Sequence, residues 1–246
     1  MQLLSTQSFG RFLAALLLAP SAINLCLAAP QPIGNTVEGS ALVARKDTSA
    51  LKSFKTKVDG ADVKIRQDQT KFVDFSQKGQ KSVSSVGYNQ CFGVIIGTNK
   101  GAVVGHYTCG DVGQQKAKTE LQREWNAHKD DKLKSPKVWL YAKVKVDDDH
   151  KIHEDTYENP DAFKEFKNIV KDITGKDAQI EKYLNVNDVI VDKGKERDGF
   201  DQKTADVYSN YAGYYVTKGL LSLDVKFMTL DMQKDSYKGE IERAGH

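Results

Sequence analysis

The most apolar stretch of the chain is a pair of short runs separated by a turn, and it limits the possible folds more than any other feature. Residues 91–97 and 102–108 are rich in Val, Ile and Gly, and the polar sequence Thr98-Asn-Lys-Gly101 joins them. Two apolar runs of this length with a four-residue connection are typical of a β-hairpin. We therefore expect a buried antiparallel hairpin, here called the Cys/His hairpin, around which the rest of the chain packs.

A second strand is predicted where apolar and polar side chains alternate. Residues 137–146 place Val, Leu and Ala at every second position and lysines between several of them. This period of two predicts a half-buried strand, with Trp139 and Tyr141 on the outer face and packed under a helix. Further strands are expected within residues 51–80, 179–186, 188–192, 213–217 and 220–228.

Two segments have helical signals. Residues 114–128 carry apolar side chains at helical spacing, and Asn159-Pro160 begins a second amphipathic segment that Gly175 ends. With the strands, these helices predict an α+β fold: mainly antiparallel sheet or a sandwich, with about two flanking helices.

The chain begins with the pattern of a secretory signal peptide. Residues 1–28 have a polar start with Arg11, an apolar run over residues 12–19, and small side chains before an expected cleavage point after Ala28. We therefore expect a secreted, extracellular protein. Residues 29–49 are expected to form a disordered arm or pro-segment, residues 50–230 a single α+β domain, and residues 231–246 a polar tail.

Charge and composition exclude several classes of protein. The chain has 36 Lys and Arg against 33 Asp and Glu, mostly interspersed, so we expect no nucleic-acid partner. After the leader, no apolar run approaches the ~20 residues of a membrane span. Asp147 to Glu154 gathers acidic residues with His150 and His153, but this spacing matches neither zinc proteases nor calcium loops, so no metal or cofactor is expected.

The residues of the Cys/His hairpin that carry chemistry are Cys91 and His106. A thiol becomes a nucleophile when a nearby imidazole takes its proton, which should lower the pKa of the thiol. If Gly97 faces Ala102, then His106 faces Gly93, and Cys91 and His106 share one sheet face as diagonal neighbours. Gly93 would leave room for the imidazole to approach the sulfur.

A shift of one residue in the strand pairing predicts a different structure. Cys91 would then face Cys109, and His106 would turn to the opposite side of the sheet. That register favours a cross-strand disulfide between Cys91 and Cys109, which is common in secreted proteins. The sequence permits both registers.

The hairpin pattern, with the His fifteen residues after the Cys, resembles that of the cysteine–histidine glutamine deamidases. These include the bacterial chemoreceptor deamidase and the cytotoxic necrotizing factor toxins, and similar hairpins occur in secreted proteins of filamentous fungi. The resemblance implies that Cys91 is the nucleophile and His106 the base. It also implies that a hydroxyl six residues before the Cys orients the imidazole, which selects Ser85, with Ser84 as the close alternative. The family usually has Gly or Ser directly before the Cys, where this chain has Gln90.

Two functions follow as expectations. The first is a secreted hydrolase with a role in virulence that deamidates glutamine side chains of a protein substrate. The backbone N–H groups of Cys91 and Phe92 would stabilise the oxyanion. The second is a non-catalytic effector that binds a host protein through the same fold, with or without the Cys91–Cys109 disulfide.

Overall fold

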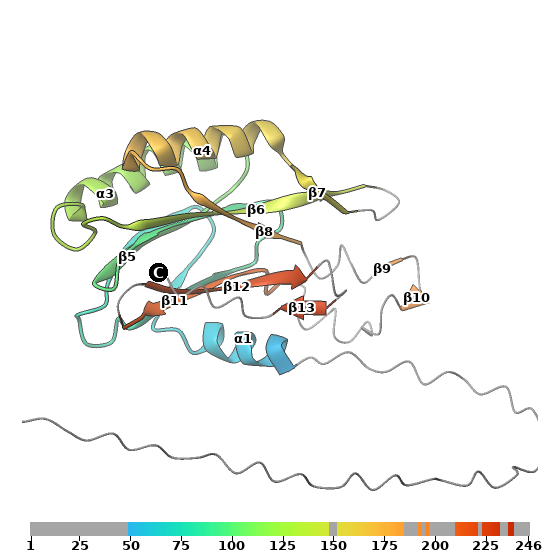
Figure 1. Cartoon of the computed structure of the whole chain (residues 1–246), viewed down its shortest axis with the longest axis horizontal. Helices are drawn as coiled ribbons and strands as arrows, with labels where there is room; N and C mark the ends of the chain where they lie inside the picture. The colour runs from blue at the N-terminus through green and yellow to red at the C-terminus, as the bar shows by residue number, and fades with distance from the viewer. Residues whose placement is uncertain are drawn as a thin grey trace, which may run out of the picture. The chain divides into compact units, whose positions relative to one another are not determined.

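The computed structural model describes residues 49–147, 152–184, 191–192, 195–196, 210–220, 223–231 and 236–238. Over these residues the chain is α+β, with mainly antiparallel sheets and three helices (Figure 1). The leader and most of the arm, residues 1–48, lie outside the described residues, as do residues 185–190 of the predicted strands.

The Cys/His hairpin lies within a six-stranded sheet. Its strands in spatial order are β2 (Gln69–Asp74), β5 (Gly101–Tyr107), β4 (Phe92–Gly97), β6 (Lys137–Val146) and β7 (Ile152–Tyr157), with β8 (Gln179–Tyr183) pairing parallel to β6. The other neighbours in this sheet are antiparallel. The predicted hairpin strands and the strand at residues 137–146 are confirmed.

A second, five-stranded sheet packs against the first. Its order is β1 (Val63–Ile65), β3 (Ser82–Val86), β11 (Gly213–Lys218), β12 (Leu223–Asp231) and β13 (Ser236–Lys238). The short strands β9 (Val191–Asp192) and β10 (Lys195–Glu196) pair with each other. β13 lies in the segment that we interpreted as a polar tail.

Three helices cover the sheets. The first is α1 (Ser49–Asp59). The second is continuous and consists of α2 (Asp111–Lys116), a π-helical turn η1 (Ala117–Leu121) and α3 (Gln122–His128). The third, α4 (Pro160–Thr174), begins with proline after Asn159 and ends at Gly175, whose φ of 69° suits a residue without a Cβ.

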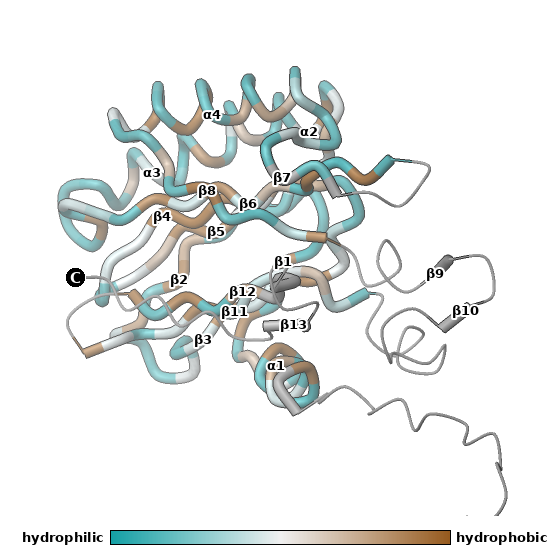
Figure 2. Tube along the Cα trace, turned by 45° about the vertical axis from the view of Figure 1, so that its right-hand side comes forward, coloured by the Kyte–Doolittle hydropathy of each residue, from teal (hydrophilic) through white to brown (hydrophobic). Residues whose placement is uncertain are grey.

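Two cores hold these layers together. One lies between the sheets and includes Ile95, Trp139 and Val216. The other lies between the six-stranded sheet and the helices, where Phe166 and Ile169 of α4 pack on Val94 and its neighbours. Figure 2 shows hydrophobic residues on the side of α4 that faces the sheet and hydrophilic residues on its outer side.

The sandwich explains why β6 differs from its prediction. We expected a half-buried strand, but both faces are buried, because helices cover one face and the five-stranded sheet covers the other. Trp139 and Tyr141 pack against the second sheet and not under a helix. The sequence period identified the strand but gave no sign of the second layer.

Helix α1 was not predicted from the sequence. Residues 51–59 were expected to contribute strands, whereas Leu51, Phe54 and Val58 recur at helical spacing and are at most 2% exposed. The lysine-rich composition concealed this narrow apolar stripe. The described residues therefore form three helices where about two were expected. Among the described residues, no helix is long and apolar enough to cross a membrane.

The close contact between β11 and β3 gives the first testable prediction. A Cβ on Gly213 would overlap the carbonyl oxygen of Ser85 and lie 2.8 Å from Cα of Val86, both backbone atoms that cannot rotate away. We expect Gly213→Ser to lower the free energy of unfolding by about 2 kcal/mol or more, measured by urea denaturation.

The control is Gly110→Ser. A Cβ at Gly110 meets no atom within 4 Å, and this position precedes α2, where serine is a favoured N-cap. Its unfolding free energy should stay within about 0.5 kcal/mol of the original or rise. Equal losses in both variants would contradict the proposed contact between β11 and β3.

Candidate active site

The register of the Cys/His hairpin determines which side chains meet. Gly97 pairs with Ala102 and Gly93 pairs with His106. This is the first of the two predicted registers. Cys91 packs in the core between the sheets, on the face where Ile95 and Val104 also lie. His106, opposite Gly93, shares that face because alternate residues of a strand point to the same side.

Ser85 reaches His106 from the other sheet. Its Oγ lies 3.0 Å from Nδ1 of His106, and both side chains are at most 2% exposed. Ser84, the alternative candidate, faces the opposite side of β3 and donates to the carbonyl oxygen of Val58 in α1 at 3.0 Å. Of the two serines, Ser85 is therefore the one beside the imidazole.

The partners of Ser85 define the tautomer of His106. The Ser85 hydroxyl donates to the carbonyl oxygen of Ile65 at 3.0 Å, which uses its single hydrogen. Its oxygen then accepts a hydrogen bond from Nδ1–H of the neutral imidazole. Nε2 is left as the basic nitrogen, and it has no hydrogen-bond partner among the described residues. This is the tautomer that a general base requires.

The space above Gly93 differs from our expectation. We expected it to be open to the imidazole, but a Cβ on Gly93 would lie 2.7 Å from the ring of Tyr214 and 3.0 Å from the hydroxyl of Tyr88. The ring of Tyr88 stacks on His106, with centroids 3.7 Å apart and planes 9° apart. Aromatic side chains therefore fill the room that the glycine provides.

Cys91 is buried beside this cluster. Its side chain is 8% exposed, and the backbone N–H of Asn89 hydrogen-bonds the thiol. No hydrogen bond joins the thiol to Nε2 of His106, whose partner position is unfilled. Cys91 and Cys109 are both free thiols, and they pack in different cores, so the alternative disulfide is not formed.

Burial keeps both groups neutral. It raises the pKa of the Cys91 thiol from 9.0 to about 11 and lowers the pKa of His106 from 6.5 to about 4, against a smaller opposing effect of the Asp68 carboxylate on His106. We expected a lowered thiol pKa, and in this closed arrangement the shift has the opposite sign. A thiolate and an imidazolium would need better solvation than this site gives.

The backbone directly before Cys91 is strained. Gln90 has a φ of 143°, a region in which a side chain is unfavourable. The hydroxyl of Tyr183 holds the segment on both sides: it accepts from the N–H of Gln90 at 3.2 Å and donates to the carbonyl oxygen of Cys91 at 2.9 Å. A backbone conformation that favours glycine is thus occupied by a residue with a side chain.

Sequence reasoning missed the tyrosines of this site. Tyr88 was detectable as the one aromatic side chain in a polar loop three residues before Cys91. Tyr183 and Tyr214 had no local signal, because they reach the site from strands about a hundred residues later. Tyr214 donates to the carbonyl oxygen of Gly105 at 2.9 Å and is fully buried.

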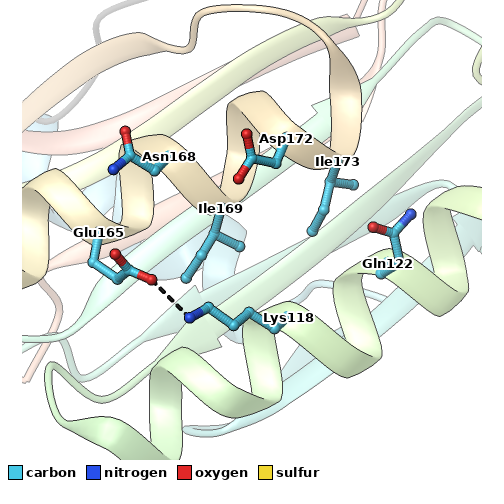
Figure 3. Close-up of a pocket in the computed structure, with 7 residues that line it drawn as sticks. All are labelled: Lys118, Gln122, Glu165, Asn168, Ile169, Asp172 and Ile173. Atoms are coloured by element: carbon cyan, nitrogen blue, oxygen red, sulfur yellow. Dashed lines mark ion pairs between the residues drawn. The ribbon is translucent and has the colours of Figure 1, made fainter.

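Two other features lie away from this constellation. His153 contacts Asp147 through Nε2 at 2.9 Å, whereas His150 and its neighbours at 148–151 lie outside the described residues. A groove of about 330 Å³ lies between α4 and the helix at residues 111–128, where Lys118 and Glu165 form an ion pair at 2.7 Å (Figure 3). Its apolar residues Ile169 and Ile173 belong to the core on the helix side of the six-stranded sheet.

No protein-family model matches the chain, and no curated protein matches it.

The pKa of His106 leads to a prediction about stability. Because the folded pKa is about 4 and the ordinary value is 6.5, the unfolded chain binds a proton in this range that the folded chain does not. Stability from the neutral imidazole is complete above pH ~6.5 and is lost as the pH falls toward ~4. Between pH 7 and pH 5.5, the free energy of unfolding should fall by about 1 kcal/mol.

Urea denaturation at both pH values measures this fall, and His106→Gln is the matched variant. The variant should be less stable at pH 7, because it disturbs the bond to Ser85, but should lose about 1 kcal/mol less on acidification. The same pH dependence in both proteins would show that His106 is not buried in its neutral form.

Proposed function

We propose that this protein is a deamidase-like hydrolase in which Cys91 attacks the side-chain amide of a protein-bound glutamine. The observation that carries the proposal is the Ser85–His106 hydrogen bond on the sheet face that also holds Cys91. Ser85 orients the imidazole and leaves Nε2 as the base. The similarity of the hairpin to that of the cysteine–histidine deamidases points to the same chemistry.

The steps follow from the roles of these groups. Nε2 of His106 takes the proton of the Cys91 thiol, and the sulfur bonds to the amide carbon of the substrate. The backbone N–H groups of Cys91 and Phe92 serve as oxyanion donors. His106 then protonates the nitrogen, the carbon–nitrogen bond breaks and ammonia leaves. Water, activated by His106, hydrolyses the thioester to glutamate and restores the thiol.

The unpartnered Nε2 of His106 supports nucleophilic chemistry over a scaffold role. An unpartnered Nε2 inside a protein costs about 1–3 kcal/mol, so a purely structural residue here would be better replaced by an apolar one. Such cost is common at sites where a group acts on a substrate. The alternative, a non-catalytic effector that binds a host protein on the same fold, assigns no role to this nitrogen.

Variants of the three residues test the proposal. Cys91→Ser and His106→Ala should each reduce conversion of Gln to Glu by roughly a thousandfold, because each removes a participant in bond formation or proton transfer. Ser85→Ala should reduce it by roughly tenfold, because it only orients the imidazole. The measurement is mass spectrometry of a mixture of Gln-containing peptides, with ammonia release as a second readout.

Ser84→Ala is the matched control, since Ser84 is equally buried but bonds to α1. It should lose stability without the same loss of turnover. If Ser84→Ala and Ser85→Ala have equal effects on turnover at equal folded fraction, the proposed role of Ser85 is wrong. If no tested peptide is converted by the folded original protein, the effector alternative replaces the enzyme.

We further propose that the protein is secreted and that its first 28 residues are removed. The polar start, apolar run and small residues before Ala29 support this. N-terminal sequencing of material from the medium should begin at Ala29, or after Lys46 if the dibasic point is cleaved. Retention of Met1 in exported protein would contradict the signal-peptide assignment.

A further inference from the structure

The loop between β3 and β4, residues 87–90, is exposed except for one side chain. Gly87, Asn89 and Gln90 face solvent, whereas Tyr88 turns inward and is 1% exposed. An aromatic residue that leaves an exposed loop to fill an interior space contributes much of what holds that loop in place.

Tyr88 covers the face of the base. Its ring stacks on the imidazole of His106 at 3.7 Å, and its hydroxyl fills the space above Gly93. The edges of the ring meet Tyr141 and Tyr183, with centroids 5.2 Å and 6.0 Å away. A glutamine side chain has no path to His106 along this face while the ring is in place.

The same loop engages the nucleophile. The N–H of Asn89 hydrogen-bonds the Cys91 thiol, so the sulfur interacts with the loop and not with Nε2 of His106. This hydrogen bond lowers the pKa of the thiol, but burial raises it by more, to about 11, and burial lowers the pKa of the imidazole to about 4. The closed loop thus accompanies an unreactive pair.

The loop has the backbone of a hinged segment. Gly87 has a φ of 86° at one end and Gln90 a φ of 143° at the other. The closed form is therefore strained at Gln90, whereas Gly87 adopts its positive φ without strain. Two long hydrogen bonds anchor it: Tyr88 N–H to the carbonyl oxygen of Ala212, and Gln90 N–H to the hydroxyl of Tyr183, both at 3.2 Å. Opening must break these two bonds and withdraw the Tyr88 ring from its contacts with His106, Tyr141 and Tyr183.

We propose that residues 87–90 form a lid, that Tyr88 is its plug, and that the Cys91–His106 site opens only when this loop swings outward between Gly87 and Gln90. The lid regulates the site of the proposed deamidase and rests on that proposal for its biological meaning. Opening would admit water to the thiol, which removes the burial that raises its pKa, and would clear the face of the imidazole. Closure would protect the thiol in the absence of substrate.

The test measures how fast iodoacetamide alkylates Cys91 in the folded full-length protein, read by mass spectrometry of the Cys91 peptide. Gly87→Val places a β-branched side chain at a φ of 86° with no atom within 4 Å of its Cβ, so it acts on the backbone conformation alone. Since an open loop can abandon this φ, the variant should favour opening and accelerate alkylation of Cys91 by about tenfold. Labelling of Cys109 should stay unchanged.

Gly79→Val is the matched control. Gly79 has a φ of 80° and equally open surroundings, but it lies in the turn between β2 and β3. It should lower global stability to a similar degree without accelerating alkylation of Cys91. Equal acceleration by both variants would mean that the thiol reacts only through global unfolding, and no acceleration by Gly87→Val would mean that the loop does not gate it. Either result overturns the lid.

The readout separates the lid from the enzyme, because alkylation requires no turnover. If Gly87→Val alone accelerates alkylation and no peptide is deamidated, the lid is supported and the deamidase proposal fails. If the original protein deamidates peptides and Cys91 is alkylated at equal rates in the two glycine variants, the enzyme is supported and the lid is overturned.

Discussion

The pairing of Gly93 with His106 across β4 and β5 is the constraint on which the site depends. It places the imidazole on the face toward the second sheet, and it sets the residue without a side chain directly opposite. A shift by one residue would turn His106 toward the helices and bring the two cysteines together. Both strands are completely buried on both faces, so such a shift would also disturb both cores.

The second sheet supplies the hydrogen-bond partner of His106. Ser85 reaches across the interior and connects His106 to the carbonyl oxygen of Ile65, so two layers of the sandwich share one hydrogen-bonded chain. A buried polar chain of this kind is favourable only when its members are satisfied. Nε2 of His106 is the exception among them, and burial keeps it uncharged.

The sequence predicted the local parts of this structure well. The strands of the hairpin, the strand at residues 137–146 and the helix between Asn159 and Gly175 all follow from periodicity and end signals. Helix α1 was missed because its apolar stripe is narrow among lysines, and the burial of Trp139 was misassigned because a single strand carries no information about what covers its second face.

The candidate site was predictable only in part, for a similar reason. Spacing along the chain indicated Cys91 and His106, and the resemblance to the deamidases implied Ser85, with Ser84 as the alternative, all within one short segment. It could not indicate that Tyr88 fills the space above Gly93, since that depends on how the loop at residues 87–90 folds back. Nor could it indicate Tyr183, which lies in β8 beside β6 and whose hydroxyl donates to the carbonyl oxygen of Cys91. The sign of the thiol pKa shift followed from this burial and not from the residue types.

The protonation state of the two imidazole nitrogens tests the central claim most directly. In protein labelled with ¹⁵N at histidine, long-range proton–nitrogen spectra at pH 7 distinguish a nitrogen that bears hydrogen from one that does not. We predict hydrogen on Nδ1 of His106, bonded to Ser85, and an unprotonated Nε2. Hydrogen on Nε2 in the neutral ring, or on both nitrogens at that pH, would contradict the arrangement in which Ser85 holds His106 as a base.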